Sequence, residues 1–404
     1  MKSSAKPSLQ FTLALIATIF SLTVIVLGSY TRLVDAGLGC PDWPSCYGHL
    51  WVPDTKAEIA RANERFQETP VETDKTWPEQ LHRLLATSLG LLILLVYAAS
   101  VYVNRARLSL LPWKSTTLLL GLFFSATAAR IFTGDILDVP LLIIALAYFA
   151  NLIRLSLATR DTARAYEHPY LLAATVTGLV ILQGLFGMWT VTLYLWPQVV
   201  TAHLMGGFTI FSLLWLLASR SYGARWELAT DEFGRLHKLQ GLAILALVLV
   251  IIQVMLGGWV ASNYAALACP DLPQCRGQWL PPVDMLEGFN IFQQVGPNYL
   301  GGQMDNDARV AIHLVHRIGA AVVTVVLLWL SLKCFASGLR PAKRYALGML
   351  AILAVQVALG ISNIVFYLPL WVAVMHNLVG AILMAFMVQF VHRIVTARSV
   401  TIAI

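Results

Sequence analysis

The sequence predicts an all-α protein that crosses a membrane many times, and three observations lead to this fold class. Of its 404 residues, 58% are hydrophobic and only 12% are charged, which is far too apolar for a soluble protein of this length. Apolar runs of about 20 residues recur along the chain, and each is long enough to cross a bilayer as a helix. Motifs of the first half also reappear in the second half, which indicates a duplicated architecture.

About ten apolar runs qualify as transmembrane helices. The first run is too long for a removable signal peptide and lacks a small-residue cleavage site, so we expect it to be retained. The predicted helices lie near residues 10–32, 79–103, 113–133, 138–158, 169–193, 200–219, 238–262, 309–334, 342–366 and 370–393.

The basic residues orient these helices in the bilayer. Lysines and arginines gather in short connections on one side of the predicted helices, and by the positive-inside rule that side is cytoplasmic. We therefore expect both termini in the cytoplasm and the two long loops, roughly 33–78 and 263–308, on the outer side. The net charge of +7 follows from this topology, and we infer no nucleic-acid partner from it.

The outer loops contain four of the five cysteines. Cys40 and Cys46 lie in the first loop, and Cys269 and Cys275 lie in the second at the same spacing. Thiols in an oxidising compartment tend to pair, so the leading hypothesis is one disulfide within each loop. Metal binding is the alternative, and it is weaker because neither loop supplies a convincing second pair of ligands.

The same loops reveal the internal repeat. Segment 40–48 aligns without gaps with segment 269–277, at an offset of 229 residues. The shared cysteines, prolines, aspartate and glycine make chance a poor explanation for this alignment. The repeat is the strongest organisational signal in the sequence.

The repeat continues into the helices, where histidines correspond in pairs. His82 matches His316 at an offset of 234, and His203 matches His376 at an offset of 173. We interpret the chain as two pseudo-repeated four-helix bundles, the first of which contains an inserted helical hairpin. The predicted bounds are 1–219 for the first half, 237–404 for the second half and about 113–158 for the hairpin.

These four histidines are the candidate metal ligands. A polar side chain inside a membrane is costly, and it usually faces the bundle interior for a functional reason. A single histidine can simply form a hydrogen bond between helices, but four of them duplicated at equal depth indicate sites. A six-coordinate haem iron takes two imidazoles from facing helices, whereas zinc and copper need further ligands. We predict two haem sites, one at His82 and His203 and the other at His316 and His376.

The residues beside these histidines differ between the halves. Glu79 lies three residues before His82, whereas the matching residue in the second half is His313. A carboxylate at one site only marks that site for chemistry, since it can take a proton or stabilise positive charge. A helix-start carboxylate that interacts with the helix dipole is the structural alternative. Arg83 and Arg317 are candidate partners of haem propionates, or they extend to lipid phosphates.

Together these motifs resemble the haem A synthase family. The resemblance rests on the Glu-x-x-His-Arg motif at 79–83, the Gln-Gly-Leu-Phe-Gly-Met-Trp-Thr-Val run at 183–191, the Ala-His-Leu segment at 202–204 and the paired-cysteine loops. It covers nearly the whole chain. It implies an enzyme of the bacterial inner membrane that oxidises the C8 methyl group of haem O to the formyl group of haem A, for cytochrome oxidase assembly.

The resemblance also implies a role for each site residue. His316 and His376 would hold a resident haem b as the cofactor, His82 and His203 would flank the haem O substrate, and Glu79 would be the catalytic carboxylate. The partners it suggests are haem O synthase, cytochrome oxidase assembly factors and a second copy of the chain. Family members usually have eight helices, so the inserted hairpin is a departure. The alternative function is a di-haem b transmembrane electron-transfer protein, in which neither haem is altered.

Overall fold

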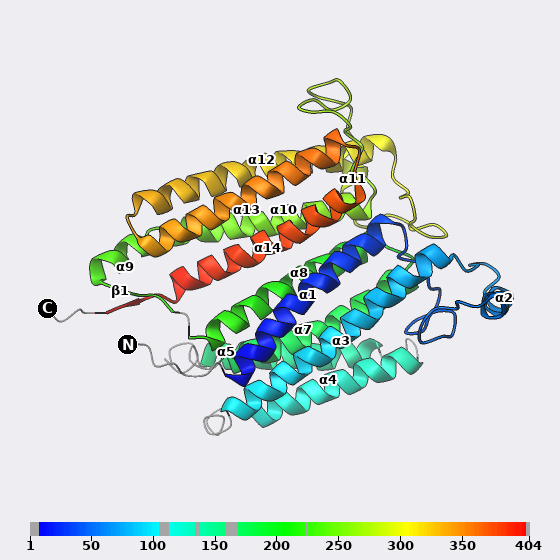
Figure 1. Cartoon of the computed structure of the whole chain (residues 1–404), viewed down its shortest axis with the longest axis horizontal. Helices are drawn as coiled ribbons and strands as arrows, with labels where there is room; N and C mark the ends of the chain where they lie inside the picture. Colours follow the sequence, from blue (N-terminus) through cyan, green and yellow to red (C-terminus); the bar gives the residue numbers. More distant parts are fainter. Residues whose placement is uncertain (1–7, 105–112, 134–137, 159–168, 224, 401–404) are drawn as a thin grey trace. The chain divides into compact units, whose positions relative to one another are not determined.

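The computed structural model is built almost entirely of α-helices (Figure 1). It describes residues 8–104, 113–133, 138–158, 169–223 and 225–400. Within these ranges the strands are β1 (Glu227–Leu228) and β2 (Arg398–Ser399), which pair in parallel. The predicted fold class, an all-α membrane protein, is therefore confirmed. The predicted turn of the inserted hairpin, at residues 134–137, lies outside the described residues.

Every predicted apolar run coincides with a helix. These helices are α1 (Leu9–Leu33), α3 (Thr73–Asn104), α4 (Trp113–Thr133), α5 (Asp138–Ala158), α7 (Tyr170–Thr192), α8 (Pro197–Ser221), α10 (Gln240–Ser262), α12 (Asn306–Ala336), α13 (Arg340–Val365) and α14 (Leu370–Val395). Among the described residues, nine helical segments are long and apolar enough to cross a membrane. The predicted tenth span corresponds to α4, a helix of 21 residues, and its crossing of the membrane stays a prediction.

Three shorter helices were not predicted, and two of them lie in the long loops 33–78 and 263–308. They are α2 (Lys56–Arg65), α9 (Thr230–His237) and α11 (Met285–Gly288). A capping box begins α2: Thr55 Oγ1 accepts from Glu58 N at 3.2 Å, and the Glu58 carboxylate accepts from Thr55 N at 3.1 Å. The hydrogen bond from the Thr55 N–H lowers the pKa of Glu58 to about 2, because it stabilises the ionised carboxylate.

The contacts divide the chain into two compact units, which we describe separately. The first unit comprises Met1–Thr23, Leu85–Leu185 and Thr209–Ala224, and the second comprises Val24–Leu84, Phe186–Phe208 and Arg225–Ile404. This division follows contacts within the chain and does not test the two sequence-repeat halves, whose bounds stay a prediction.

Polar contacts between helices hold the first unit together. Helix α4 packs along α5. Tyr148 on α5 donates a hydrogen bond to the carbonyl oxygen of Ala174 on α7 at 2.6 Å, and the hydroxyls of Tyr97 and Tyr170 lie 3.0 Å apart. Such hydrogen bonds join helices in an apolar surrounding, where packing alone gives little hydrophobic driving force. They join α5 of the predicted hairpin to α7, and α7 to α3.

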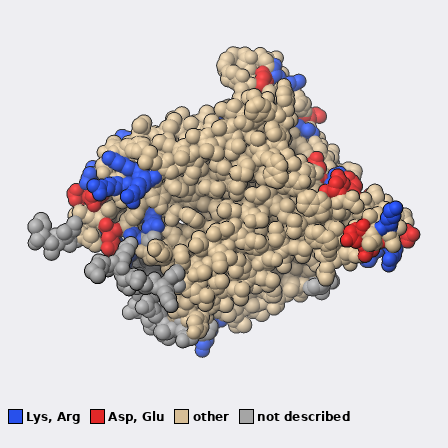
Figure 2. Space-filling view, viewed as in Figure 1, with Lys and Arg blue, Asp and Glu red and all other residues tan. Residues whose placement is uncertain are grey.

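The second unit contains a closed bundle of four helices. Helices α10 and α13 each contact both α12 and α14, so the four form a ring. Leu327, Leu330 and Phe390 on these helices are fully buried, whereas Val325 and Leu332 are exposed, as expected of a surface that faces lipid. On the face shown in Figure 2, the sides of these helices carry almost no charged side chains, which gather instead near the helix ends.

Residues that correspond in the repeat touch one another within the second unit. Arg32 Nη2 donates to the carbonyl oxygen of Ala261 at 2.7 Å, and the Tyr264 hydroxyl donates to Asp35 Oδ1 at 2.9 Å. Both pairs are separated by 229 residues, which is the offset of the cysteine loops. Contacts between equivalent positions are what a local two-fold relation between the two segments produces.

Candidate functional site

The first pair of candidate ligands meets inside the second unit. His82 lies on α3 and His203 on α8, each within about three turns of its helix N-terminus. Their imidazole centroids are 6.4 Å apart, and the ring planes are nearly perpendicular, at 81°. Two metal–nitrogen bonds of about 2 Å each would take up about 4 Å of this separation, and the two ring radii would take up the rest. The spacing therefore suits one metal ion between the two rings.

The second pair lies in the bundle of the same unit. His316 lies on α12 and His376 on α14, two helices of the closed four-helix bundle. Each has a glutamine beside it from a neighbouring helix. Gln253 Nε2 lies 3.0 Å from His316 Nδ1, and Gln356 Nε2 lies 3.4 Å from His376 Nε2. These amides are polar neighbours that can orient the imidazoles.

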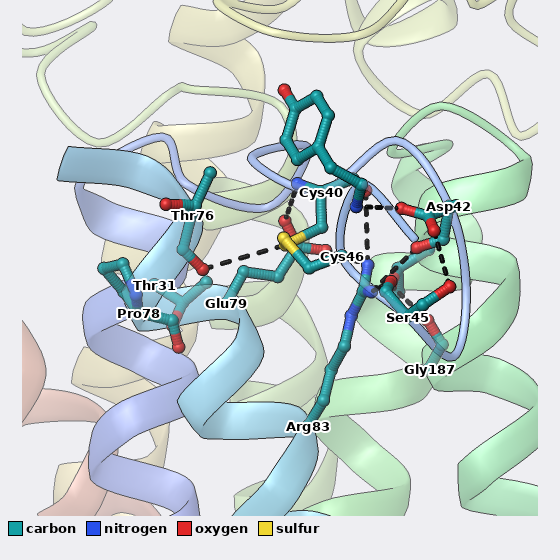
Figure 3. Close-up of polar contacts among 12 residues, drawn as sticks. Thr31, Cys40, Asp42, Ser45, Cys46, Thr76, Pro78, Glu79, Arg83 and Gly187 are labelled. Carbon is teal, nitrogen blue, oxygen red and sulfur yellow. Dashed lines mark hydrogen bonds and ion pairs between the residues drawn. A yellow bond between two sulfur atoms is a disulfide. The ribbon is translucent and has the colours of Figure 1, made fainter. Parts of the chain in front are cut away.

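Glu79 is buried beside the first cysteine loop, with only 4% of its surface exposed. The Cys40 N–H donates to Glu79 Oε2 at 2.9 Å, and Arg83 Nη2 donates to Glu79 Oε1 at 2.5 Å (Figure 3). Both carboxylate oxygens thus accept a hydrogen bond, one of them charge-assisted. These two bonds hold the carboxylate in one orientation. Along α3, Glu79 precedes His82 by three residues and Arg83 by four.

Arg83 joins the helix to the loop. Its Nη1 donates to the carbonyl oxygens of Asp42 and Ser45, both at 2.8 Å, and its Nη2 donates to that of Cys40 at 3.3 Å (Figure 3). Sequence analysis did not predict these contacts, because it placed Arg83 only by its position next to a histidine. The binding of a haem propionate by this residue stays a prediction.

The second cysteine loop is held in a similar way, with one chemical difference. Arg317 Nη1 donates to the Gln274 carbonyl oxygen at 3.0 Å, and its Nη2 donates to that of Cys269 at 2.6 Å. In place of a carboxylate, His313 Nδ1 lies 3.3 Å from the Cys269 N–H and its Nε2 lies 3.3 Å from Arg317 Nε. A neutral imidazole can accept at only one nitrogen, so His313 cannot satisfy both donors as Glu79 does. A propionate role for Arg317 likewise stays a prediction.

Both predicted disulfides are present. Cys40 is bonded to Cys46, and Cys269 is bonded to Cys275, with Cα–Cα distances of 4.8 and 4.7 Å. The four sulfurs are therefore not available as metal ligands. Asp271 closes the turn inside the second loop by accepting hydrogen bonds from two backbone N–H groups, at 2.5 and 2.7 Å. These bonds hold the pKa of its carboxyl below the usual value.

The histidine pairs fit a haem iron. Among the described residues, Nδ1 of His82 and Nδ1 of His376 are buried without a hydrogen-bond partner. A buried polar atom without a partner costs free energy, and a bond from that nitrogen to a metal would remove this cost. Imidazole is a common axial ligand of haem iron, and a helix bundle offers ligands from facing helices. The donor set and its spacing are thus compatible with haem.

Sequence analysis missed the glycines that contact these rings. Each imidazole lies against a glycine of a neighbouring helix. The pairs are Gly28 with His82, Gly187 with His203, Gly257 with His316 and Gly360 with His376. The signal was in the repeat, since Gly28 corresponds to Gly257 and Gly187 to Gly360 at the offsets already found.

The fold and the site define a class: a multi-pass all-α membrane protein with two pairs of partly buried imidazoles and disulfide-closed loops. The chain belongs to the COX15-CtaA family of cytochrome oxidase assembly proteins, whose family model matches residues 11–127 and 133–388. This finding confirms the family resemblance derived from the motifs.

Individual relatives agree with the family assignment. A protein of Shewanella oneidensis named heme A synthase is 37% identical over 369 residues, which cover 91% of this chain and 92% of that protein. A protein of Methylobacterium radiotolerans with the same name is 26% identical over 371 residues, which cover 89% of this chain and 83% of that protein. The similarity therefore extends over nearly the full length of both relatives.

Proposed function

We propose that this chain is a haem A synthase, a membrane oxidoreductase that converts the C8 methyl group of haem O to the formyl group of haem A. Membership of the family and the relatives named heme A synthase support the activity. The observation that carries the proposal is the buried Glu79 carboxylate, placed one turn from His82 where His82 and His203 face each other at 6.4 Å. None of the relatives described above supports the alternative, a di-haem electron-transfer protein.

The two histidine pairs would have different tasks in this function. His82 and His203 would hold the haem O substrate, so that its oxidisable methyl group lies in the site that contains Glu79. His316 and His376 would hold a resident haem b, which supplies one-electron redox chemistry when bound. The support for this assignment is the asymmetry between Glu79 and His313, because the two sites otherwise share their ligand type and their loop contacts.

The protein's own contribution would be positioning and electrostatics. Glu79 is oriented by Cys40 and Arg83, so its negative charge is fixed at one place. A fixed carboxylate stabilises positive charge that develops on the substrate, or it takes a proton released from the methyl group. The reaction exchanges methyl hydrogens for an oxygen atom and releases electrons and protons. It therefore needs an electron acceptor and an oxygen source in addition to the residues of this chain.

The setting we propose follows from the charge pattern and the family. The chain would lie in the bacterial inner membrane with both termini in the cytoplasm, and the disulfide loops would face outward. Haem O synthase would supply the substrate, and cytochrome oxidase assembly factors would receive the product. Self-association through the lipid-facing helices is a further proposal, to be checked by the mass of the purified protein.

A haem analysis tests the function directly. The chain is expressed together with a haem O synthase in cells that lack a haem A synthase, and the haems are extracted and identified by mass. We expect haem A to accumulate, and to be absent when the chain carries Glu79→Gln. Membranes that contain the folded wild-type chain but only haem b and unmodified haem O would refute the proposal.

The proposed topology is tested separately with inserted tags. A tag inserted at residue 290 should react with impermeant reagents from outside, and a tag at the C-terminus should not.

A further inference from the structure

The four glycines of the second unit that lie against the site histidines share one contact. At each of them, the nearest heavy atoms that a Cβ would meet belong to the imidazole ring of the paired histidine. The contact is therefore between a bare helix backbone on one side and an aromatic ring on the other. It occurs at all four candidate ligands, in both halves of the repeat.

The distances show that a side chain would not fit at these positions. A Cβ at Gly28 would lie 2.7 Å from Cε1 of His82, and a Cβ at Gly360 would lie 3.1 Å from Cε1 of His376. At Gly187 and Gly257 the corresponding distance is 3.3 Å. Carbon atoms in favourable contact are about 3.5–4.0 Å apart, so an alanine would displace the ring at every position. The displacement would be largest at Gly28.

We infer that these glycines are positioning residues: by lacking a Cβ, they allow each imidazole to lie against a helix and so set the direction of its nitrogens toward iron. This inference rests on the proposed function, because it assumes that the imidazoles bind haem. At Gly187 and Gly257, Cε1 and Nδ1 of the ring lie within 4 Å of the Cβ position, whereas Nε2 does not. These two rings therefore turn Nε2 away from the glycine, which leaves that nitrogen to ligate a metal.

Other glycines in the same unit pack differently, which separates this contact from ordinary helix packing. A Cβ at Gly258, the residue after Gly257, would meet Thr201 and Leu204 of another helix. At Gly288 it would lie 2.7 Å from the backbone oxygen of Ala308. A substitution at either of these glycines would push against a neighbouring helix or its backbone. Displacing a helix or a backbone segment has a high energetic cost. An imidazole at the end of a side chain can rotate, so at the four positions the ring is displaced before the backbone is.

Alanine substitutions in the full-length protein test this inference, with haem binding and iron spectra as the readouts. Gly28→Ala addresses the first site, and Gly257→Ala addresses the second. The matched controls are Gly90→Ala on α3 and Gly241→Ala on α10, where a Cβ would meet nothing within 4 Å. Each protein is purified in detergent, its copurifying haem b is quantified, and haem O is titrated into it. Optical and EPR spectra then distinguish bis-imidazole low-spin iron from high-spin iron.

We expect a reciprocal pattern. Gly28→Ala should weaken haem O binding about tenfold or more and shift that iron toward high spin, because an off-rotamer imidazole ligates poorly. Its haem b content and spectrum should stay those of the wild type. Gly257→Ala should lower haem b occupancy and leave haem O affinity unchanged. Both controls should behave as wild type in both measurements.

Several outcomes would overturn the inference. Wild-type affinities and spectra in Gly28→Ala and Gly257→Ala would do so, as would equal losses in the two controls. If Gly28→Ala fails to fold, as judged by its thermal midpoint, Gly187→Ala tests the same site through a milder contact. A wild-type chain with no low-spin haem would also contradict it. A wild-type chain that binds both haems in low-spin form but makes no haem A would refute only the proposed function.

Discussion

Replacing Glu79 by histidine would give the first site the residue that the second site has. His313 occupies the matching place and lies 3.3 Å from both the Cys269 N–H and Arg317 Nε. Glu79 makes its contacts at 2.9 Å with Cys40 and at 2.5 Å with Arg83. Because the second cysteine loop has the same design and contains His313 at this place, Glu79→His should fold. It removes the carboxylate charge and keeps a hydrogen-bond acceptor near the loop.

The expected magnitudes separate stability from activity. A hydrogen bond to a charged group contributes about 1.5–3 kcal/mol and a neutral one about 0.5–1.5 kcal/mol, so the exchange should cost about 2 kcal/mol of folding stability. A positioned acid–base group contributes about 10²–10⁴-fold to the rate. This corresponds to about 3–5 kcal/mol of activation free energy. Formation of haem A should thus fall by about 100-fold or more in a protein that still folds.

The assay compares the ratio of haem A to haem O, measured by mass, in membranes that contain equal amounts of each variant. The thermal midpoint and the spectrum of the resident haem report whether the variant is folded. Glu79→Gln is the matched control, since it keeps the shape of the side chain and one acceptor oxygen. It should be as inactive as Glu79→His but more stable than Glu79→Ala, which removes the acceptors of both the Cys40 N–H and Arg83 Nη2. Wild-type haem A formation by Glu79→His would refute the catalytic role of the carboxylate.

The remaining predictions concern the ligands and the two loops. His82→Ala should abolish tight haem O binding and retain haem b, whereas His316→Ala should do the reverse; loss of both haems in both variants, measured by haem content, would contradict two separate sites. Replacing Cys40 and Cys46 by serine should destabilise the first loop by about 2 kcal/mol and lower haem A formation, because the loop backbone holds Glu79. Asp271 has a lowered pKa, so its carboxylate supports the second loop at neutral pH and loses this effect as the pH falls through its value in the folded protein. Asp271→Asn should accordingly speed amide exchange of that loop at neutral pH and have little effect in acid.

The helices were predictable because a bilayer imposes a simple rule on the sequence. An apolar run of about 20 residues without charges has few other stable structures in lipid. All ten predicted runs are helices. The helices α2 and α11 were missed because they lie in polar loops, where capping residues such as Thr55 and Asp284 determine the helix starts. Such local hydrogen bonds leave only a weak pattern in the sequence.

The histidine pairs were predictable for a different reason. Each lies at matching positions of the repeat, so the sequence alone placed them at equal depth, and the structure brings His82 and His203 to 6.4 Å. The contacts of Arg83 were not predictable in the same way. A guanidinium has several donors and a long flexible stem, and its partners depend on the course of a loop far away in the sequence. The contacts of the four glycines were not predicted either. A residue without a side chain gives no chemical signal of what lies against it.

The two histidine sites share most of their structure, so the residue in which they differ indicates where the reaction takes place. Both sites have paired imidazoles, glycines behind the rings, a disulfide loop and an arginine that donates to loop carbonyls. A feature that occurs at both sites cannot explain a reaction at only one of them. Glu79 and His313 differ in charge, and in a medium of low polarity a fixed charge has a large effect on nearby protons and cations. The proposed chemistry therefore depends on this one carboxylate, and a His313→Glu variant should give the second site a charge without removing its haem. If that variant began to oxidise haem bound at His316 and His376, the carboxylate would be sufficient; if it did not, substrate orientation would also be required.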